Sequence, residues 1–394
     1  MSTTAFESRR ALRFVLLIGV VSLFADLTYE GARSITGPFL ASLGASGFLV
    51  AVVAGAGELL GYGLRIVSGR LSERTHEFWP ITLAGYLVQM AAVPALALTQ
   101  SWPAASVCIL LERTGKAIRN PPRDVMLSHA ARHIGYGWAF GVHEALDQMG
   151  ALLGPLTVAV IVARRGSYQT AFAILVVPAI LTYAVLLTAR RLYPRTEELE
   201  ARAPRLEPAG LPPIYWIYLA GAAIVAAGFA DFQLIAYHAG RDRALDPLWI
   251  PLAYAIAMGV SGLGSLVCGR LFDRVGLVVL IPLTIVSAVF APLVFLGGFW
   301  SVLIGCALWG LGMGVHESIV PAAVALMVRP ERRPSAYGVF TGVYGLAWFA
   351  GSAVMGAIYD RSIIGVVIFC VVLQLIAVPV LWRVRQQMRA MAQV

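Results

Sequence analysis

The sequence predicts an all-α protein that crosses a membrane many times. Of its 394 residues, 59% are hydrophobic and only 13% are charged, and the mean hydropathy is +0.78. A soluble domain carries about 25% charged residues, so this composition excludes an ordinary soluble protein. The apolar residues also gather in runs of about 20, which is the length that an α-helix needs to cross a bilayer.

Twelve such runs follow one another along the chain. The first has basic residues before it but no cleavage site of small residues, so we interpret it as a retained membrane span. The predicted spans lie near residues 12–42, 46–68, 78–98, 103–128, 136–162, 168–189, 214–240, 247–268, 277–297, 300–328, 336–358 and 362–382.

One long polar segment, residues 191–213, separates the sixth span from the seventh. Its charge and its proline content indicate a solvated linker. We therefore predict an N-terminal six-helix bundle at residues 1–190 and a C-terminal six-helix bundle at residues 214–394.

The two halves repeat short segments in the same order and at nearly constant offsets. The repeated pairs are GRLSER (69–74) with GRLFDR (269–274), FAD (24–26) with FAD (229–231), and YG (136–137) with YG (337–338). This pattern indicates a parallel duplication of a six-helix unit, giving two pseudo-symmetric bundles. Such duplications are typical of transporters that rock two bundles about a site near the midplane.

The arginines predict the orientation of the chain in the membrane. With the N-terminus inside, the outside loops keep only Arg164, Arg165, Arg241, Arg243 and Arg361, whereas the inside loops, linker and tail hold the other arginine clusters. Because basic residues favour the cytoplasmic side, we expect both termini there, in the plasma (inner) membrane.

At this point the chain resembles a transporter of the major facilitator superfamily over nearly its whole length. The loop motif of that family, roughly G-x-L-A-D-R-x-G-R-K, is matched by Gly69, Leu71 and Arg74, with Glu73 in place of the aspartate. The later glycine and basic pair of the motif are absent here.

The second copy of this loop keeps an aspartate, an arginine and Gly276 of the motif. The resemblance implies that the two loops bridge helix ends and latch one conformational state. The implied latch residues are Gly69, Arg70, Glu73, Arg74, Gly269, Arg270, Asp273 and Arg274.

The fifth span carries a second family-like motif at Gly150, Gly154 and Pro155. It resembles the G-x-x-x-G-P motif of the proton-coupled drug antiporters and implies export rather than uptake. The alternative is a plain packing motif, because small residues four apart let two membrane helices approach closely and proline bends a span.

Charged side chains form one-sided stripes on three spans. The stripes are Asp26, Tyr29, Glu30 and Arg33 in span one, Glu112, Lys116, Arg119 and Arg123 in span four, and His143 and Asp147 in span five, with Glu144 beside them. Charges at bilayer depth are costly and are usually paired and functional. Since spans four and five are antiparallel neighbours, we expect Lys116 and Arg119 to form salt bridges with His143 and Glu144.

Carboxylates outnumber basic residues at the predicted bilayer depth. A carboxylate without a basic partner there is suited to carry a proton. We predict that Asp26 or Asp147 carries the proton. In the C-terminal half the polar signals are Asp231 in span seven and the pair His316 and Glu317 in span ten. The full set of candidate coupling and cavity residues is Asp26, Glu30, Lys116, His143, Glu144, Asp147, Asp231, His316 and Glu317.

These features predict a secondary active transporter, functional as a monomer in the lipid bilayer, whose partners are a small-molecule substrate and protons. The first hypothesis is proton-coupled export of an amphipathic or cationic molecule by alternating access. The second is a divalent-metal exporter that resembles ferroportin, with Asp26, Asp147 and His316 as ligands. The third is import of an anionic solute that binds Lys116, Arg119 and Arg33.

Other classes of protein have little support in the sequence. It has no nucleophile elbow, no HExxH and no phosphate loop, so we expect neither an enzyme nor a cofactor. The arginines fall in short clusters between apolar runs, which does not favour a nucleic-acid partner. The four cysteines all lie within apolar runs, and we interpret them as packing residues.

Overall fold

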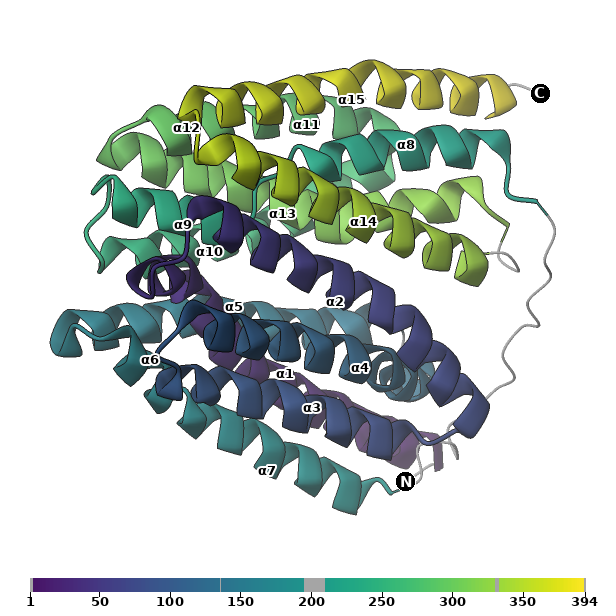
Figure 1. Ribbon diagram of the computed structural model, residues 1–394. Helices are drawn as coiled ribbons and strands as arrows, with labels where there is room; N and C mark the ends of the chain where they lie inside the picture. The colour runs from purple at the N-terminus through teal and green to yellow at the C-terminus, as the bar shows by residue number, and fades with distance from the viewer. Residues whose placement is uncertain (1–2, 135, 195–209, 330–332, 393–394) are drawn as a thin grey trace. The chain divides into compact units, whose positions relative to one another are not determined.

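A computed structural model describes residues 3–134, 136–194, 210–329 and 333–392. All of the long secondary-structure elements in these ranges are α-helices (Figure 1). No strand occurs in these ranges. The predicted fold class, an all-α membrane protein, is confirmed. Of the helices described, 11 are long and apolar enough to cross a membrane.

In the part of the first half that the structure describes, the chain forms seven α-helices and one short 3₁₀ helix. They are α1 (Thr3–Ser42), α2 (Gly47–Thr75), α3 (Phe78–Ala95), η1 (Leu96–Leu98), α4 (Trp102–Ile134), α5 (Tyr136–Arg165), α6 (Tyr168–Ile174) and α7 (Val176–Leu192). The helix at the fourth predicted span, α4, is absent from the 11 apolar helices. Six charged residues between positions 112 and 124 account for this difference.

The second half contains eight α-helices and one 3₁₀ helix in the ranges described. They are α8 (Pro213–Ala227), α9 (Phe232–Arg241), α10 (Trp249–Val275), η3 (Gly276–Val279), α11 (Leu280–Ala288), α12 (Phe290–Leu296), α13 (Phe299–Met327), α14 (Arg333–Tyr359) and α15 (Ile363–Ala392).

Two predicted spans are interrupted by proline. The sixth divides into α6 and α7 after Ile174, and the ninth divides into α11 and α12 after Ala288. Pro178 and Pro292 each lie four residues beyond these helix ends. A proline lacks the N–H that would bond the carbonyl four residues earlier, and its ring crowds that carbonyl, so the α-helical ladder stops there.

The seventh span is also broken, although no proline marks the break. Helix α8 ends at Ala227, residues 228–231 are not helical, and α9 begins at Phe232. The predicted span at 214–240 corresponds to one candidate membrane span, Pro213–Arg241, which this break divides into two half-helices. Asp231, the repeat counterpart of Asp26, therefore lies at the start of a half-helix.

Contacts within the chain group the residues into two units. The first comprises residues 1–35 and 60–203, and the second comprises residues 36–59 and 204–394. The end of α1 and the start of α2 are thus grouped with the C-terminal helices. The boundaries that the polar linker suggests, 1–190 and 214–394, remain a prediction.

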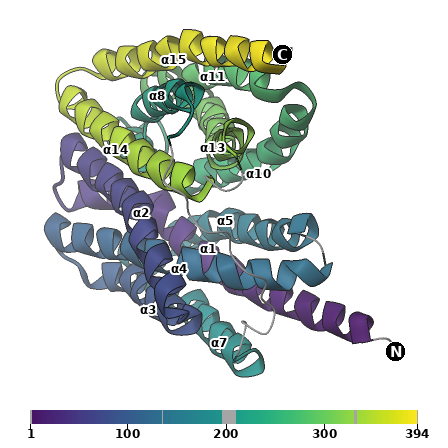
Figure 2. The same cartoon turned by 90° about the vertical axis from the view of Figure 1, so that its right-hand side faces the viewer.

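Each unit has its own helix pairs. In the first, α3 packs along α4 and also contacts α7, and in the second, α10 packs along α13 (Figures 1 and 2). The first unit also contains an apolar core at the N-terminal part of α1, where Phe14, Trp79 and Tyr193 pack edge to face.

Candidate functional site

A buried polar network lies in the first unit, with Asp26 of α1 near its centre. The Tyr29 hydroxyl donates to Asp26 Oδ2 at 2.9 Å, and Lys116 Nζ donates to the Tyr29 hydroxyl at 2.6 Å. Arg119 Nη2 lies 4.0 Å from Asp26 Oδ1. The one lysine of the chain thus reaches Asp26 through a tyrosine, while Arg119 faces it directly.

Arg119 is almost completely buried, and it joins α4 to α3. Its Nη1 donates to the Tyr86 hydroxyl at 2.8 Å, and its Nε donates to Gln89 Oε1. The guanidinium also lies 4.4 Å above the centre of the Tyr86 ring. Gln89 then passes a hydrogen bond on to Glu112, from Nε2 to Oε1 at 2.8 Å. The network therefore holds the guanidinium in one position beside Asp26.

Two glycines bring α3 and α4 close enough for this network. A Cβ on Gly115 would lie 2.5 Å from the backbone nitrogen of Gln89, and one on Gly85 would lie 2.7 Å from that of Arg119. A Cβ atom essentially never lies this close to a backbone atom of a neighbouring helix. The absence of side chains at these positions lets the two backbones meet, which places Gln89 within reach of Arg119.

The same device brings α5 against α1. A Cβ on Gly150 would overlap the carbonyl oxygen of Leu23, and one on Gly154 would lie 2.5 Å from the carbonyl oxygen of Leu27. Gly150 and Gly154 of the predicted antiporter-like motif therefore lie at a close packing contact between α5 and α1, and the antiporter function of the motif stays a prediction. Pro155 follows them within α5.

This close crossing sets two carboxyl groups against each other. Asp147 lies one turn before Gly150, and its carboxyl group is near enough to that of Asp26 to form a hydrogen-bonded pair when one of the two is protonated. Asp26 Oδ1 accepts no hydrogen bond from the residues that the structure describes. The pair is consequently a place where one proton can be held between two helices.

The predicted salt bridges between spans four and five are wrong. Lys116 and Arg119 bond to residues of α1 and α3, as described above, because α4 turns its charged stripe toward those helices. His143 Nε2 instead lies 2.8 Å from Ser22 Oγ of α1. Glu144 is exposed and accepts a hydrogen bond from Gln148 Nε2 at 2.9 Å on its own helix.

Other charged residues of the stripes pair locally. Arg33 Nη1 lies 3.9 Å from Glu30 Oε1, one turn away on α1. Arg113 Nε lies 3.5 Å from Glu112 Oε2. Arg123 Nη2 lies 2.8 Å from Asp124 Oδ1. Each of these three arginines therefore has a carboxylate next to it on its own helix.

Sequence reasoning missed three members of the network: Ser22, Tyr86 and Gln89. Gln89 is the one that a sequence signal could have shown, because it is a lone amide within the apolar run of span three. Ser22 and Tyr86 fit ordinary membrane helices and give no such signal.

The second unit surrounds Asp231 with neutral donors. Trp348 Nε1 donates to Asp231 Oδ1 at 3.1 Å, and Ser352 Oγ donates to Oδ2 at 2.8 Å. His316 Nδ1 lies 3.0 Å from the Tyr344 hydroxyl, and its ring centre is 4.4 Å from that of Phe229. The side chain of Glu317 lies outside the described residues.

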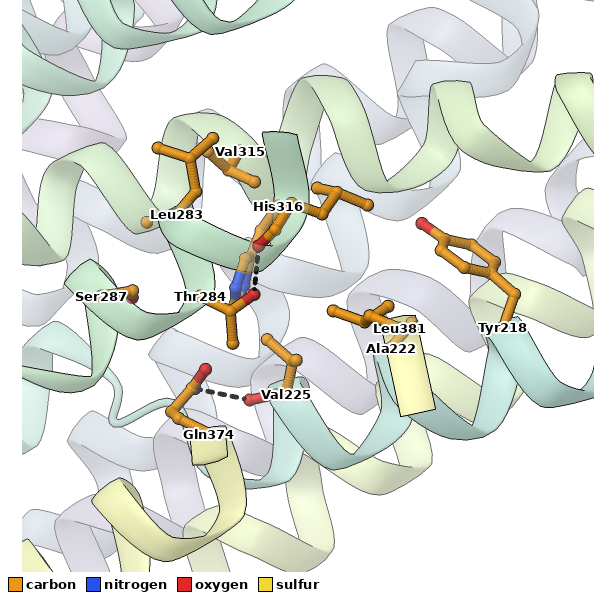
Figure 3. Close-up of a pocket in the computed structure, with 12 residues that line it drawn as sticks. Tyr218, Ala222, Val225, Leu283, Thr284, Ser287, Val315, His316, Gln374 and Leu381 are labelled. Atoms are coloured by element: carbon orange, nitrogen blue, oxygen red, sulfur yellow. Dashed lines mark hydrogen bonds between the residues drawn. The ribbon is translucent and has the colours of Figure 1, made fainter. Parts of the chain in front are cut away.

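A small cavity opens beside His316 in this unit, between α8, α11, α13 and α15 (Figure 3). Its polar lining includes Thr284, Ser287 and Gln374. Ser287 Oγ and Gln374 Oε1 have no hydrogen-bond partner among the described residues, whereas Gln374 Nε2 donates to the Val225 carbonyl at 3.0 Å. Groups of this kind suit a buried water molecule.

The loop residues that the resemblance implies as a latch lie at two helix ends. Arg70, Glu73 and Arg74 are exposed in the last turns of α2, next to Gly69. In the second copy, Gly269, Arg270 and Arg274 lie near the end of α10, and the side chain of Asp273 falls outside the described residues. Their latch function stays a prediction.

Among the described residues, no group of three or more His, Cys, Asp or Glu side chains is arranged to hold a metal ion. The metal-exporter hypothesis therefore gains no observation from this structure.

Comparison with known proteins supports the fold. A family model described as Major Facilitator Superfamily matches residues 18–352. An uncharacterized protein of Mycobacterium tuberculosis is 42% identical over 384 residues, which cover 95% of this chain and 93% of that protein. An uncharacterized MFS-type transporter of Methanocaldococcus jannaschii is 24% identical over 368 residues, covering 90% of this chain and 91% of that protein.

Among solved structures, the chain is similar to a bacterial homologue of the human lysosomal transporter Spinster in an inward-facing and unoccupied conformation. The two share 14% sequence identity and a TM-score of 0.72, over 97% of this chain and 98% of that chain. At this identity the likeness concerns the fold alone.

Proposed function

The chain belongs to the major facilitator superfamily, and we propose that it is a proton-coupled secondary transporter that exports a small amphipathic or cationic molecule by alternating access. Its family and its fold are those of a transporter rather than an enzyme. It is a multi-pass membrane protein. The arginine distribution supports a plasma-membrane location with both termini in the cytoplasm.

The observation that carries the proposal is the pairing of Asp26 with Asp147 inside the first unit. Asp26 is buried and Asp147 is half-buried, so the two facing carboxyl groups compete for one proton, because both cannot be charged there at low cost. Proton binding and release at this pair is the chemistry that coupling requires. His143 lies one turn from Asp147 and is buried, so we propose it as a second proton-exchanging group.

A change in the protonation of this pair can alter how the helices that carry it pack. Asp26 and Asp147 lie on α1 and α5, which touch backbone to backbone at Gly150. Lys116 and Arg119 supply the positive charge that a deprotonated Asp26 needs. When a proton neutralises Asp26, the attraction of Arg119 for α1 weakens, and the balance between packings of α1 and α4 changes.

The basic residues themselves favour the counter-ion function over an anion site. Lys116 donates to Tyr29, Arg119 to Gln89 and Tyr86, and Arg33 lies beside Glu30. A substrate anion would have to displace these partners. A cation, in contrast, would be attracted to the Asp26–Asp147 pair after its proton leaves, which links substrate binding to proton release. Export rests on the likeness of Gly150, Gly154 and Pro155 to the antiporter motif.

The test uses purified protein in sealed liposomes with an imposed pH gradient and the membrane potential held at zero. The probes are tetraphenylphosphonium and ethidium, which carry a permanent charge and do not follow pH passively. An antiporter accumulates the probe in the acidic compartment, whereas a symporter accumulates it in the alkaline one.

We expect Asp26→Asn and Asp147→Asn each to lower gradient-driven accumulation at least about tenfold, because a positioned proton-transfer group contributes about 10²–10⁴-fold to the rate of the step that it serves. Glu77→Gln is the matched control, because Glu77 is an exposed acid of the same unit, and it should transport normally. Full gradient-driven transport by both asparagine variants would end the proposal.

Lys116→Ala separates the cation proposal from the anion alternative. We expect altered coupling with the cation probes still transported. If the variant instead loses transport of a small dicarboxylate that the parent protein takes up, the anion hypothesis replaces ours.

A further inference from the structure

A groove at the N-terminal end of α1 has the features of a lipid site. It has a volume of about 560 Å³ and lies between α1 and α7, outside the polar network. Arg10 and Arg13 line one end, and Leu16, Leu17 and Val20 continue along the same face of α1. Asp26 lies 13 residues beyond Arg13, or about 20 Å along the helix.

The two helices are fixed to each other at the charged end of this groove. The Tyr193 hydroxyl donates to the carbonyl of Arg10 at 3.1 Å, and Trp79 Nε1 donates to the carbonyl of Tyr193 at 2.9 Å. The Arg10 guanidinium lies 5.7 Å from the centre of the Tyr193 ring. A stacked guanidinium still presents N–H donors at its edge, so Arg10 is held in place and able to bind an anion.

The groove combines positive charge at one end with apolar walls along its length. Among the described residues that line it, Arg10 and Arg13 carry charge and no carboxylate is present. Arg190 and Arg191 add two more basic residues in the last turn of α7, directly before the lining residue Leu192. Leu16 and Leu192 are 43% and 59% exposed, so the apolar walls are open to what surrounds the helices.

In a bilayer the surroundings of a span are lipid, and one class of molecule matches this pattern. The phosphate of a lipid accepts paired hydrogen bonds from a guanidinium, while its acyl chain covers an apolar groove. Arginines near the end of a span lie at headgroup depth, because their long side chains reach toward the interface. We propose that this groove binds one anionic glycerophospholipid, with its phosphate on Arg10 and Arg13 and an acyl chain along Leu16, Leu17 and Val20.

The experiment is native mass spectrometry of the full-length protein, titrated with dioleoylphosphatidylglycerol or with dioleoylphosphatidylcholine. The two lipids share their acyl chains and differ in net charge. We expect the first phosphatidylglycerol molecule to bind on the order of tenfold more tightly than phosphatidylcholine, given two arginine contacts. The double variant Arg10→Gln/Arg13→Gln should lose this preference.

A matched pair of substitutions controls for overall charge. Arg361 and Arg383 are exposed arginines of the second unit, and Arg361→Gln/Arg383→Gln should keep the preference. A separate variant, Leu16→Trp, fills the apolar part and should weaken the first binding event for both lipids, while leaving the arginines unchanged. Glycerol phosphate, which has no acyl chain, should not compete.

Three results would overturn the proposal. These are an unchanged preference in the Arg10/Arg13 variant, an equal loss in the Arg361/Arg383 control, and full competition by glycerol phosphate, which would indicate a soluble phosphate ligand instead. Size-exclusion elution and melting temperature of each variant establish that it is folded. Transport by the Asp26–Asp147 pair is measured separately, so the outcome here does not depend on the proposed transport function.

Discussion

The two units of the molecule bury different kinds of interior. Among the described residues, every buried Arg, Lys, Asp or Glu except Asp231 belongs to the first unit: Asp26, Glu30, Arg33, Glu112, Arg113, Arg119 and Arg123. The second unit buries aromatic rings, with Phe229 in contact with Phe290, Trp309, His316 and Trp348. The first unit therefore has a charged interior and the second has an aromatic one.

The difference is clearest at the two repeated aspartates. Asp26 lies in a continuous helix and faces a second carboxyl group, an arginine and a lysine–tyrosine pair. Asp231 lies at a helix break and accepts hydrogen bonds from an indole and a hydroxyl. The first environment suits a change of protonation, because several charges there can compensate for it. The second suits a fixed structural position, since the indole of Trp348 and the hydroxyl of Ser352 stay neutral.

The largest effect should come from removing Arg119. Arg119→Met leaves Asp26 without its facing charge and leaves Gln89 and Tyr86 without a donor. Breaking a buried ion pair on one side costs about 3–5 kcal/mol in proteins. We expect a loss of stability of this size, measured as the midpoint of unfolding in detergent by intrinsic fluorescence.

The matched substitution in the second unit is Asp231→Asn. Asparagine keeps an oxygen for one of the two donors, Trp348 or Ser352, and we expect a loss of about 1 kcal/mol, the net value of one hydrogen bond. If Asp231→Asn destabilised the protein as much as Arg119→Met, the contrast between a charged and a neutral interior would be wrong.

The next largest effect should come from replacing glycines at close helix contacts, a feature that both units share. A Cβ on Gly150 would overlap the Leu23 carbonyl, and one on Gly351 would overlap the Ala227 carbonyl beside the α8 break. Overpacking of this kind costs about 1–3 kcal/mol. We expect Gly150→Ala and Gly351→Ala to lower the melting temperature by similar amounts, in a fluorescence-based thermal unfolding assay.

Each of these glycines has a control on its own helix. A Cβ on Gly141 of α5 or on Gly338 of α14 would meet nothing within 4 Å. Gly141→Ala and Gly338→Ala should therefore leave stability unchanged or raise it slightly, because alanine favours the helix. Equal destabilisation by all four alanines would show that contact with the neighbouring helix is not the cause.

A third pair of substitutions separates transport from stability. Tyr29→Phe removes the hydroxyl that links Lys116 to Asp26, and Trp348→Phe removes the indole donor to Asp231. Each loses hydrogen bonding worth about 1 kcal/mol. We expect both variants to be slightly less stable, but only Tyr29→Phe to change the pH dependence of probe transport in liposomes. A changed pH dependence in Trp348→Phe instead would move the coupling site to the second unit.

The fold class could be predicted from the sequence because apolar run length and repeat order are encoded locally. The helix breaks before Pro178 and Pro292 could also be predicted from the sequence, because a proline lacks the N–H that would continue the helix. The break after Ala227 could not, because no proline marks it. It is stabilised by tertiary contacts, such as the hydrogen bond from Trp309 Nε1 to the Ala230 carbonyl at 2.8 Å.

The candidate site was only partly predictable for a similar reason. Helical periodicity correctly placed Asp26, Tyr29 and Glu30 on one stripe, but it does not say which neighbouring helix a stripe faces. That choice depends on where two backbones approach, and Gly85 and Gly115 direct α4 toward α3. The partners of Lys116 and Arg119 therefore differ from those that sequence adjacency suggested.

The smallest effect concerns the exposed side of α5, where Glu144 accepts a hydrogen bond from Gln148. The sequence grouped Glu144 with the coupling residues, yet its side chain bonds within its own helix. A hydrogen bond between side chains in a membrane protein contributes about 0.6 kcal/mol on average. We expect Gln148→Ala to lower the free energy of unfolding by about this amount and to leave probe transport unchanged.

A double-mutant cycle is needed to measure the hydrogen bond itself, because Gln148→Ala also removes packing contacts. Combining it with Glu144→Ala isolates the energy of the pair itself. A coupling energy near 0.6 kcal/mol with normal transport would place Glu144 outside the charged interior of the first unit. A loss of gradient-driven transport in Glu144→Ala would instead extend the proton-exchanging group from Asp147 along α5 to Glu144, and the boundary of the charged interior would have to move with it.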